Sequence, residues 1–322
     1  MRAVVFEQSG RPEDVLFVRD APQPTPGRGQ VSIRVSTRAI QPADFLFIEG
    51  RYRAKPVLPQ VAGLEGTGTI AACGAEVTAF KPGERVAFRS PGAWAEFAVA
   101  PITRVYRVPP AVPDTIASQF ALNPLTAWGL LAECGLPESS RLLITAGRSV
   151  VARILNRLAH RRRLKVSLLV REGLEFAVLD GDDGRVITKV GSVVEALATV
   201  VKNGFFHAVL DSVGGENTLA LIDALEPRGR LISYGILDDR DITIKASRIL
   251  YKNMIWQGFG IDGWLNNADQ SQLERAQREL WEVLSDEQDL LPVLQSYALS
   301  DIQEAIRVAR KAHQPGKVLL TG

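Results

Sequence analysis

The stretch LLITAGRSVVARILNRLAH, residues 142–160, decides how this chain folds. It opens with an apolar run, which predicts a buried strand, and Gly147 then supplies a sharp turn. After Ser149, apolar residues recur at spacings of three and four, the period of a helix that buries one face. A buried strand, a sharp turn and an amphipathic helix form the arrangement in which dinucleotide-binding folds place their phosphate loop.

The turn departs from the usual glycine-rich pattern, because Gly147 is its only glycine. Gly147 can make the bend, and Ala152 is small enough to let the helix lie close to the sheet. Arg148 stands where a small residue is usual, and its guanidinium either pairs with phosphate oxygens or fills the space that a cofactor needs. Ser149 suits a helix cap or a hydrogen-bond donor to phosphate. We expect the phosphates of a cofactor to bind to Gly147, Arg148, Ser149, Val150 and Val151.

Strands and helices alternate on both sides of this stretch, and the strands are continuously apolar. This pattern predicts an α/β domain over residues 119–265, a doubly wound parallel sheet with helices on both faces. Within it, EGLEFAVL (172–179) predicts a short helix and RVITK (185–189) predicts a strand. Residues 1–118 have short apolar runs separated by Pro and Gly, which predicts a partly open β-barrel, and we expect 266–322 to return to that domain.

Composition places the chain among ordinary globular proteins. Its 322 residues suit two domains, 46% of them are hydrophobic, and the net charge of +2 does not indicate nucleic-acid binding. Two cysteines give no disulfide framework, and three histidines show no metal-ligand spacing. The N-terminus begins in a strand pattern rather than a signal peptide, and no apolar run is long enough to span a membrane, so we expect a cytoplasmic protein.

The end of the next apolar strand bears on which cofactor binds. In NAD-binding folds an acidic residue at this strand end holds the ribose 2′-hydroxyl, whereas an arginine suits the 2′-phosphate of NADP. Here SLLVRE (167–172) places Arg171 there, directly before Glu172. We therefore expect NADPH, with a plain surface arginine as the alternative.

Seven segments spread along the chain are distinctive when taken together: QPADFLFIEGRY (41–52), PQVAGLEGTGTI (59–70), KPGERV (81–86), NPLTAW (123–128), LDSVGG (210–215), SYGI (233–236) and the terminal GKVLL. Together they resemble the medium-chain dehydrogenase/reductase superfamily, and the resemblance covers almost the whole chain. The resemblance implies a GroES-like, partly open β-barrel domain followed by a Rossmann domain. It also implies a homodimer formed through the last strand of the Rossmann domain.

The resemblance points to the zinc-independent branch, which holds the quinone oxidoreductases and the trans-2-enoyl thioester reductases. Zinc-dependent members have a cysteine where this chain has Gln41, and Gly-His-Glu where it has Gly63-Leu64-Glu65. The four-cysteine structural zinc lobe is also missing. The segment IEGRY is similar to one that places a tyrosine in the active site of this branch.

Without a metal, reduction of a conjugated carbonyl is the chemistry that we expect. Hydride added at the β-carbon leaves charge on the carbonyl oxygen, where hydrogen-bond donors can stabilise it. Tyr52 is the predicted proton donor, with a turn tyrosine that packs at the domain edge as the alternative. Asn123 is a second candidate near the reacting groups, although Asn-Pro is equally a helix-start signal. The predicted substrates are small molecules or acyl chains on a carrier: enoyl thioesters first, with quinones as the alternative. A relative that only binds or regulates is the alternative of another class, because of Arg148 and Ala152.

Further residues are candidates for the cofactor site, each with a structural alternative. Thr126 touches the nicotinamide or merely follows a helix start, and Tyr234 lies at a strand end where α/β folds bind ligands or packs there. Phe259 and Trp264 line the site or belong to a core. Lys317 contacts phosphate or is exposed.

Overall fold

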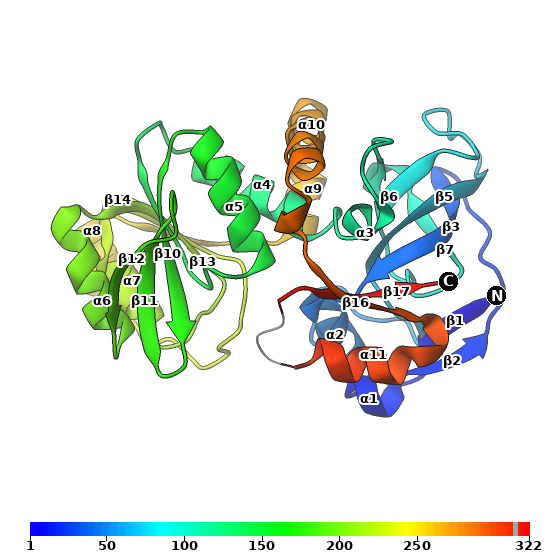
Figure 1. The fold of residues 1–322 in the computed structure, drawn as a ribbon, viewed down its shortest axis with the longest axis horizontal. Coiled ribbons are helices and arrows are strands. Elements are labelled where there is room, and N and C mark those ends of the chain that lie inside the picture. The colour runs from blue at the N-terminus through cyan, green and yellow to red at the C-terminus, as the bar shows by residue number, and fades with distance from the viewer. Residues whose placement is uncertain (312–314) are drawn as a thin grey trace. The chain divides into compact units, whose positions relative to one another are not determined.

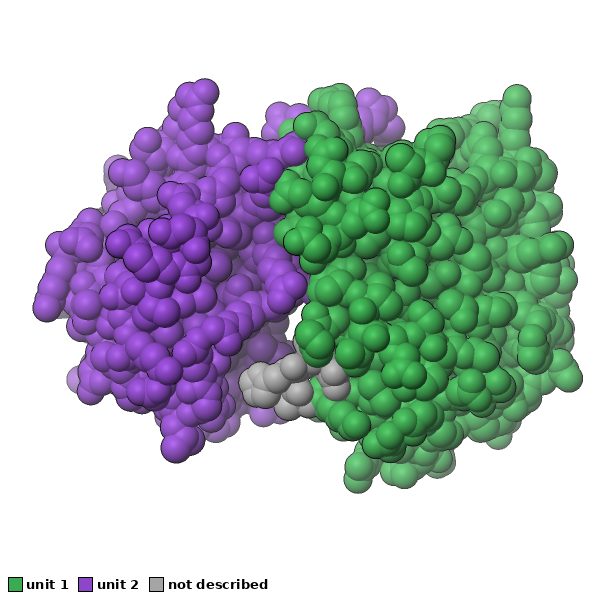
Figure 2. Space-filling model, in the orientation of Figure 1, with its two compact units in different colours: residues 1–123, 277–322 green, residues 124–276 purple. Residues whose placement is uncertain are grey.

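The computed structural model describes residues 1–311 and 315–322. The chain forms two compact units, coloured separately in Figure 2: unit 1 comprises Met1–Asn123 and Gln277–Gly322, and unit 2 comprises Pro124–Ala276. The long helix α10 (Gln270–Asp286) contains the second crossing of the chain between them.

Unit 1 is built on β-sheets (Figure 1). Its strands are β1 (Arg2–Phe6), β2 (Phe17–Asp20), β3 (Gln30–Ala39), β4 (Gln60–Val61), β5 (Glu65–Cys73), β6 (Arg85–Arg89), β7 (Phe97–Pro101), β8 (Val105–Arg107), β16 (Val293–Ala298) and β17 (Lys317–Thr321). Its helices are α1 (Pro12–Val15), α2 (Pro42–Ile48), α3 (Asp114–Ala117) and α11 (Ile302–Ala309). The main sheet has the order β16-β17-β3-β5-β6-β8 with β7 also on β3, and a smaller sheet has the order β2-β1-β4.

The last strand of the chain completes the core of unit 1. Strand β17 pairs antiparallel with β3, with Leu319 opposite Ala39. Val318 and Leu320 are buried in one cluster with N-terminal residues such as Phe6. Burial of this apolar surface from both ends of the chain therefore holds the C-terminal segment in unit 1.

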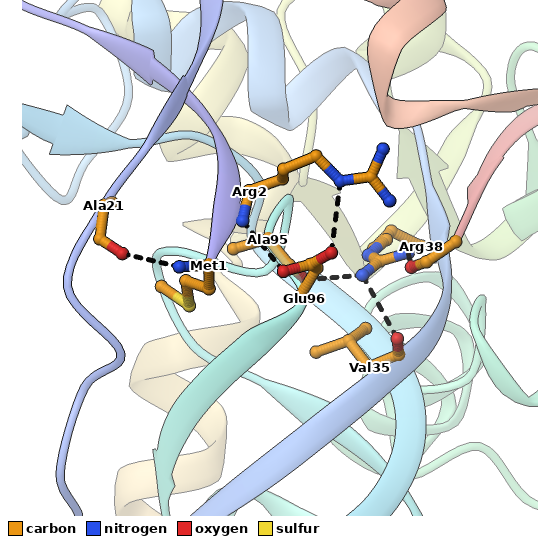
Figure 3. Close-up of polar contacts among 8 residues, drawn as sticks. Met1, Arg2, Ala21, Val35, Arg38, Ala95 and Glu96 are labelled. Carbon is orange, nitrogen blue, oxygen red and sulfur yellow. Dashed lines mark hydrogen bonds and ion pairs between the residues drawn. The ribbon is translucent and has the colours of Figure 1, made fainter.

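A buried arginine ties several of these strands together (Figure 3). The Arg38 guanidinium on β3 donates to the carbonyl oxygens of Val35 and Ala95, and to that of Gly322 at 2.8 Å. Burial lowers the pKa of Arg38 to about 10, so it stays charged at neutral pH. Nearby, Glu96 accepts a hydrogen bond from the Arg2 side chain at 3.1 Å. The contacts of Arg38 are structural, because backbone carbonyl oxygens accept the hydrogen bonds of its guanidinium.

Unit 2 is a seven-stranded sheet of order β12-β11-β10-β9-β13-β14-β15. The strands are β9 (Arg141–Ile144), β10 (Lys165–Glu172), β11 (Glu175–Asp180), β12 (Val186–Val190), β13 (Phe206–Asp211), β14 (Leu225–Ser233) and β15 (Ile255–Gly258). The helices are α4 (Asn123–Cys134), α5 (Val150–Arg161), α6 (Val193–Val200), α7 (Thr218–Asp223), α8 (Ala246–Lys252) and α9 (Ile261–Asn267). Strands β10, β9, β13, β14 and β15 are parallel neighbours, which confirms the predicted α/β class with a Rossmann sheet.

The short helix expected over 172–179 is wrong, because the chain forms a hairpin there. Strand β10 turns at Gly173, which has a φ of +66°, and returns antiparallel as β11. Val178 lies in the core of the unit and Phe176 packs against the same core, and the spacing of two residues places both side chains on one face of a strand. The strand expected over 185–189 is confirmed as β12, which also pairs antiparallel. The parallel sheet is thus extended by two antiparallel strands in place of a helical crossover.

Candidate functional site

The turn between β9 and α5 is shaped for close packing against the sheet. Ala146 has a left-handed φ of +47°, and Gly147 follows it. A Cβ at Gly147 would lie 2.7 Å from the Cβ of Leu168 and 3.0 Å from the Cγ1 of Val170, both on β10. The glycine is therefore needed to seat the turn on the neighbouring strand.

The first turn of α5 offers free backbone donors. Ser149 is the N-cap, and its hydroxyl oxygen accepts the N–H of Ala152 at 3.2 Å. Val150 and Val151 occupy the next two positions, and within the described part of the chain their N–H groups have no acceptor. Unpaired N–H groups and the positive end of the helix dipole bind anions, so this helix start fits a diphosphate.

Arg148 does not lie free on this turn. Its guanidinium pairs with the Glu172 carboxylate at the end of β10. The Nζ atom of Lys189 on β12 lies 3.1 Å from Glu172 and 3.1 Å from Glu175. The hydrogen bond from Lys189, together with Arg148, holds the pKa of Glu172 below its usual value. Arg171, beside them, donates to the carbonyl of Gly173 at 3.0 Å.

The structure therefore gathers three cations and two carboxylates at the C-terminal end of β10. The sequence identified Arg148 and Arg171 and missed Lys189 and the pairing of Glu172. The missing information was the hairpin, since β12 brings Lys189 to this edge of the sheet.

A second polar group occupies the ends of β9 and β13. The Thr145 hydroxyl donates to Asp211 Oδ1 at 2.7 Å and accepts the N–H of Ser212 at 2.9 Å. Asp211 also accepts the N–H groups of Val213 at 3.0 Å and Gly214 at 3.1 Å. Thr145 and Asp211 were not predicted from the sequence, although each is a polar residue at the end of a buried apolar strand. Together they fix the loops at the carboxyl ends of the central strands, where open α/β sheets bind ligands.

Tyr234 follows β14 at the same edge. Its backbone N–H donates to the Asp211 carbonyl at 2.8 Å, and its phenol is enclosed, which raises its pKa. Gly235 lies against Ser212, where a Cβ would be 2.5 Å from the carbonyl oxygen. Tyr234 is thus part of the packed support of these loops.

Phe259 and Trp264 pack against helix α4. A Cβ on Gly129 would lie 2.8 Å from Phe259 Cζ and 3.0 Å from Trp264. The rings of Trp264 and Trp128 have centroids 5.6 Å apart, and Trp264 is buried. Thr126 lies partly exposed on the same helix. These aromatic residues were expected either to line the site or to belong to a core, and the structure places Trp264 in a core.

Unit 1 holds a buried polar cluster around Gln41. The backbone N–H of Gln41 donates to Asp44 Oδ2 at 2.7 Å, and its side-chain Nε2 donates to Glu65 Oε1 at 2.8 Å. The Asn123 amide donates to Gln41 Oε1 at 3.2 Å. Gln41 thus links the start of α2, the start of β5 and Asn123, all within unit 1.

The two carboxyl groups of this cluster lie fully out of water. Asp44 Oδ1 and Glu65 Oε2 are buried, and among the described residues they have no hydrogen-bond partner. Burial raises the pKa of each group to about 7, against the lowering effect of Arg89 and Lys317. Burial lowers the pKa of Lys317, which is half-buried beside these carboxyl groups and not simply exposed.

Tyr52 is held at the edge of the cluster by an arginine. The β5–β6 ladder places Glu65 directly opposite Arg89. Arg89 Nη2 donates to the Tyr52 hydroxyl at 2.9 Å, and Tyr52 packs partly buried against the core. Of the candidates from the sequence, Tyr52, Asn123 and Lys317 therefore lie in unit 1 with Gln41. The others lie in unit 2: Thr126, Gly147, Arg148, Ser149, Val150, Val151, Arg171, Tyr234 and Phe259.

Asp44, Glu65 and Arg89 were not predicted from the sequence as members of this cluster. Each is a charged residue inside an apolar strand or helix pattern, as Glu65 is in VAGLEG, and that pattern could have indicated them. Residues 1–311 and 315–322 contain no group of three or more His, Cys, Asp or Glu side chains placed to hold a metal ion. Over the same ranges, no helix combines the length and apolar character of a membrane span.

Comparison with known proteins gives this geometry a context. Residues 27–110 match the family model of the alcohol dehydrogenase GroES-like domain, and residues 183–320 match that of the zinc-binding dehydrogenase domain. The chain is 26% identical to mouse mitochondrial enoyl-[acyl-carrier-protein] reductase over 330 residues, covering 100% of this chain and 88% of that protein.

Solved structures share the whole fold. A putative NADPH:quinone reductase from Mesorhizobium loti matches with a TM-score of 0.85 and 26% identity, over 100% of this chain and 98% of that one. A mycobacterial protein solved in complex with NADPH matches with a TM-score of 0.84 and 25% identity, over 100% of both chains. The chain belongs to the medium-chain dehydrogenase/reductase superfamily, on the zinc-independent branch that carries Gln41 and Leu64 where zinc ligands would stand.

Proposed function

We propose that this protein is an NADPH-dependent reductase of conjugated carbonyl compounds, with enoyl thioesters as the first substrate class. Similarity to an enoyl-[acyl-carrier-protein] reductase along the whole chain supports the reaction class. The likeness to a mycobacterial protein that binds NADPH supports the cofactor. The observation that carries the proposal is the Tyr52 hydroxyl held by Arg89 beside buried carboxyl groups.

The residues of unit 2 fit a dinucleotide. The open N–H groups of Val150 and Val151 and the hydroxyl of Ser149 would hold the diphosphate at the start of α5. The cations at the end of β10, Arg148 and Arg171, would hold the 2′-phosphate. When bound, NADPH supplies the hydride. Thr126, Tyr234 and Phe259 remain predicted cofactor contacts.

The residues of unit 1 would handle the proton. Reduction at the β-carbon leaves an enolate, and the conjugation of the substrate spreads its negative charge onto the carbonyl oxygen. In the proposed reaction the Tyr52 hydroxyl donates the proton that completes reduction at the α-carbon, and the resulting phenolate then takes a new proton from water. The hydrogen bond from Arg89 keeps the phenol in position, and it stabilises the phenolate formed as the proton leaves.

The remainder of the cluster holds this arrangement in place. Gln41 satisfies one oxygen of Glu65, and the Asn123 amide orients Gln41 in turn. Because Asn123 donates to Gln41, we propose that it is a positioning residue for the cluster. We also propose that Lys317 balances the charge of Asp44 and Glu65 instead of binding a cofactor phosphate.

The test is Tyr52→Phe, which removes one hydroxyl and keeps the ring. We expect kcat for a crotonyl thioester to fall about 100-fold, the lower part of the range for loss of a general acid, with little change in NADPH affinity. Tyr297→Phe in strand β16 is the matched control, and it should retain the activity of the unmodified protein. Unchanged turnover in Tyr52→Phe would assign the tyrosine to packing.

Quinone reduction is the second candidate, favoured by the similarity to the quinone reductase from Mesorhizobium loti. Steady-state NADPH consumption separates the two. Turnover with crotonyl thioesters and not with quinones supports the first reaction, and the reverse pattern supports the second. We also propose that the protein is a cytoplasmic homodimer. Light scattering after size exclusion would measure the mass of the assembly and so test the dimer.

A further inference from the structure

We infer that Glu172 is an internal anion that occupies the 2′-phosphate-binding cations in the free protein and so limits how strongly the protein prefers NADPH over NADH. The inference rests on the proposed function, because it concerns the same cofactor. It assigns to Glu172 and Lys189 a part in cofactor selection that follows from the contacts at the end of β10.

The first observation is that Glu172 binds two cations at once. Arg148 pairs with its Oε1 atom, and Lys189 Nζ lies 3.1 Å from its Oε2 atom. Arg148 comes from the turn before α5 and Lys189 from β12, so the carboxylate joins the phosphate turn to the hairpin. A phosphate group bound here would offer oxygen atoms to the same two donors.

The second observation is the hairpin that brings these groups together. Glu172 and Glu175 are direct partners in the β10–β11 ladder, where like charges repel. Lys189 lies between them, 3.1 Å from each carboxylate, and relieves the repulsion. A helical crossover after β10 would leave neither Glu175 nor Lys189 at this position.

The charges at the end of β10 affect NADPH binding and NADH binding differently. Among the described residues, the acidic side chains that contact Arg148 and Lys189 are Glu172 and Glu175. Arg171 donates to the carbonyl of Gly173, so the three cations outnumber the two carboxylates by one. A 2′-phosphate, with nearly two negative charges, must displace Glu172 from Arg148 and Lys189 to use both cations. NADH lacks this phosphate and leaves both ion pairs intact.

A second reading of Glu172 predicts the opposite result. An acidic residue at the end of this strand can accept hydrogen bonds from the ribose hydroxyls of NADH. In that case loss of the carboxylate weakens NADH binding. If Glu172 is instead an internal anion, its loss strengthens NADPH binding and leaves NADH binding unchanged.

The test titrates the whole protein with NADPH and with NADH by calorimetry and compares Glu172→Gln with Glu175→Gln. Glu175 contacts Lys189 and, among described residues, no other cation, so it is the matched control. We expect Glu172→Gln to tighten NADPH binding about fivefold, as expected for release of exposed ion pairs, and to change NADH binding less than twofold. Glu175→Gln should change NADPH binding less than twofold.

Increasing salt supplies a second readout, because it screens exposed ion pairs. The advantage of Glu172→Gln over the unmodified protein should shrink as salt rises. An unchanged ratio of the two affinities in Glu172→Gln, or weaker NADH binding, would overturn the inference while leaving the proposed function intact. If the unmodified protein binds neither nucleotide at millimolar concentration, the proposed function fails and the inference falls with it.

Discussion

Replacement of Gly147 by alanine tests why the turn between β9 and α5 keeps its single glycine. The added Cβ would lie 2.7 Å from the Cβ of Leu168, 3.0 Å from Val170 Cγ1 and 3.3 Å from the carbonyl carbon of Leu168. Rotation cannot relieve the first and third contacts, because those atoms belong to β10 or attach directly to it. Overpacking of this kind costs about 1–3 kcal/mol.

Part of that cost is offset in the unfolded chain. Gly147 does not have a left-handed φ, so alanine can adopt its backbone conformation, and Gly→Ala then contributes roughly 0.4–1 kcal/mol by restricting the unfolded state. The expected net loss is about 1–2 kcal/mol in the unfolding of unit 2, measured by urea denaturation without nucleotide.

Gly191→Ala is the matched control, because a Cβ there would meet no atom within 4 Å. It should leave stability equal or slightly higher. If Gly147→Ala kept full stability and lost NADPH affinity more than tenfold, the glycine would serve the close approach of the cofactor, and the packing argument would be refuted.

Two further predictions follow from charges in the two units. Asp44 and Glu65 keep their protons up to about pH 7 when folded and lose them near pH 4 when unfolded, so the folded state binds more protons between these values. Their contribution to the free energy of unfolding therefore falls as pH rises from about 4 to about 7. The combined variant Asp44→Asn, Glu65→Gln lacks this loss, so its urea midpoint relative to that of the unmodified protein should be higher at pH 7.5 than at pH 5. An equal difference between the two midpoints at both pH values would contradict this. Arg171→Ala should weaken NADPH binding about tenfold and NADH binding little, measured by calorimetry, and equal losses would remove the 2′-phosphate role of Arg171.

The sequence predicted the parts of the fold that local patterns determine. The apolar run and the helical period of 142–160 became β9 and α5, with Ser149 as the N-cap. Residues 172–179 were predicted incorrectly because their apolar spacing suits a helix or a strand. Whether this segment forms a helix or a strand depends on the packing of Phe176 and Val178 against the unit 2 core, whose other residues lie far away in the sequence.

The site shows the same division between local and distant information. Tyr52 and Asn123 were proposed from the segments around them. Arg89 was missed because its partners are set by the β5–β6 register, which places it opposite Glu65 and in reach of Tyr52, 37 residues away. Lys189 was missed for the same reason, since only the hairpin brings it to Glu172.

Transfer of deuterium from the cofactor tests the proposed reaction most directly. The protein would be incubated with a crotonyl thioester and NADPH carrying deuterium at the transferred position of the nicotinamide, and the product examined by NMR. We predict one deuterium at the β-carbon and a solvent-derived proton at the α-carbon of the saturated thioester. Oxidation of the NADPH without deuterium at the β-carbon, or no oxidation with any conjugated carbonyl, would contradict it.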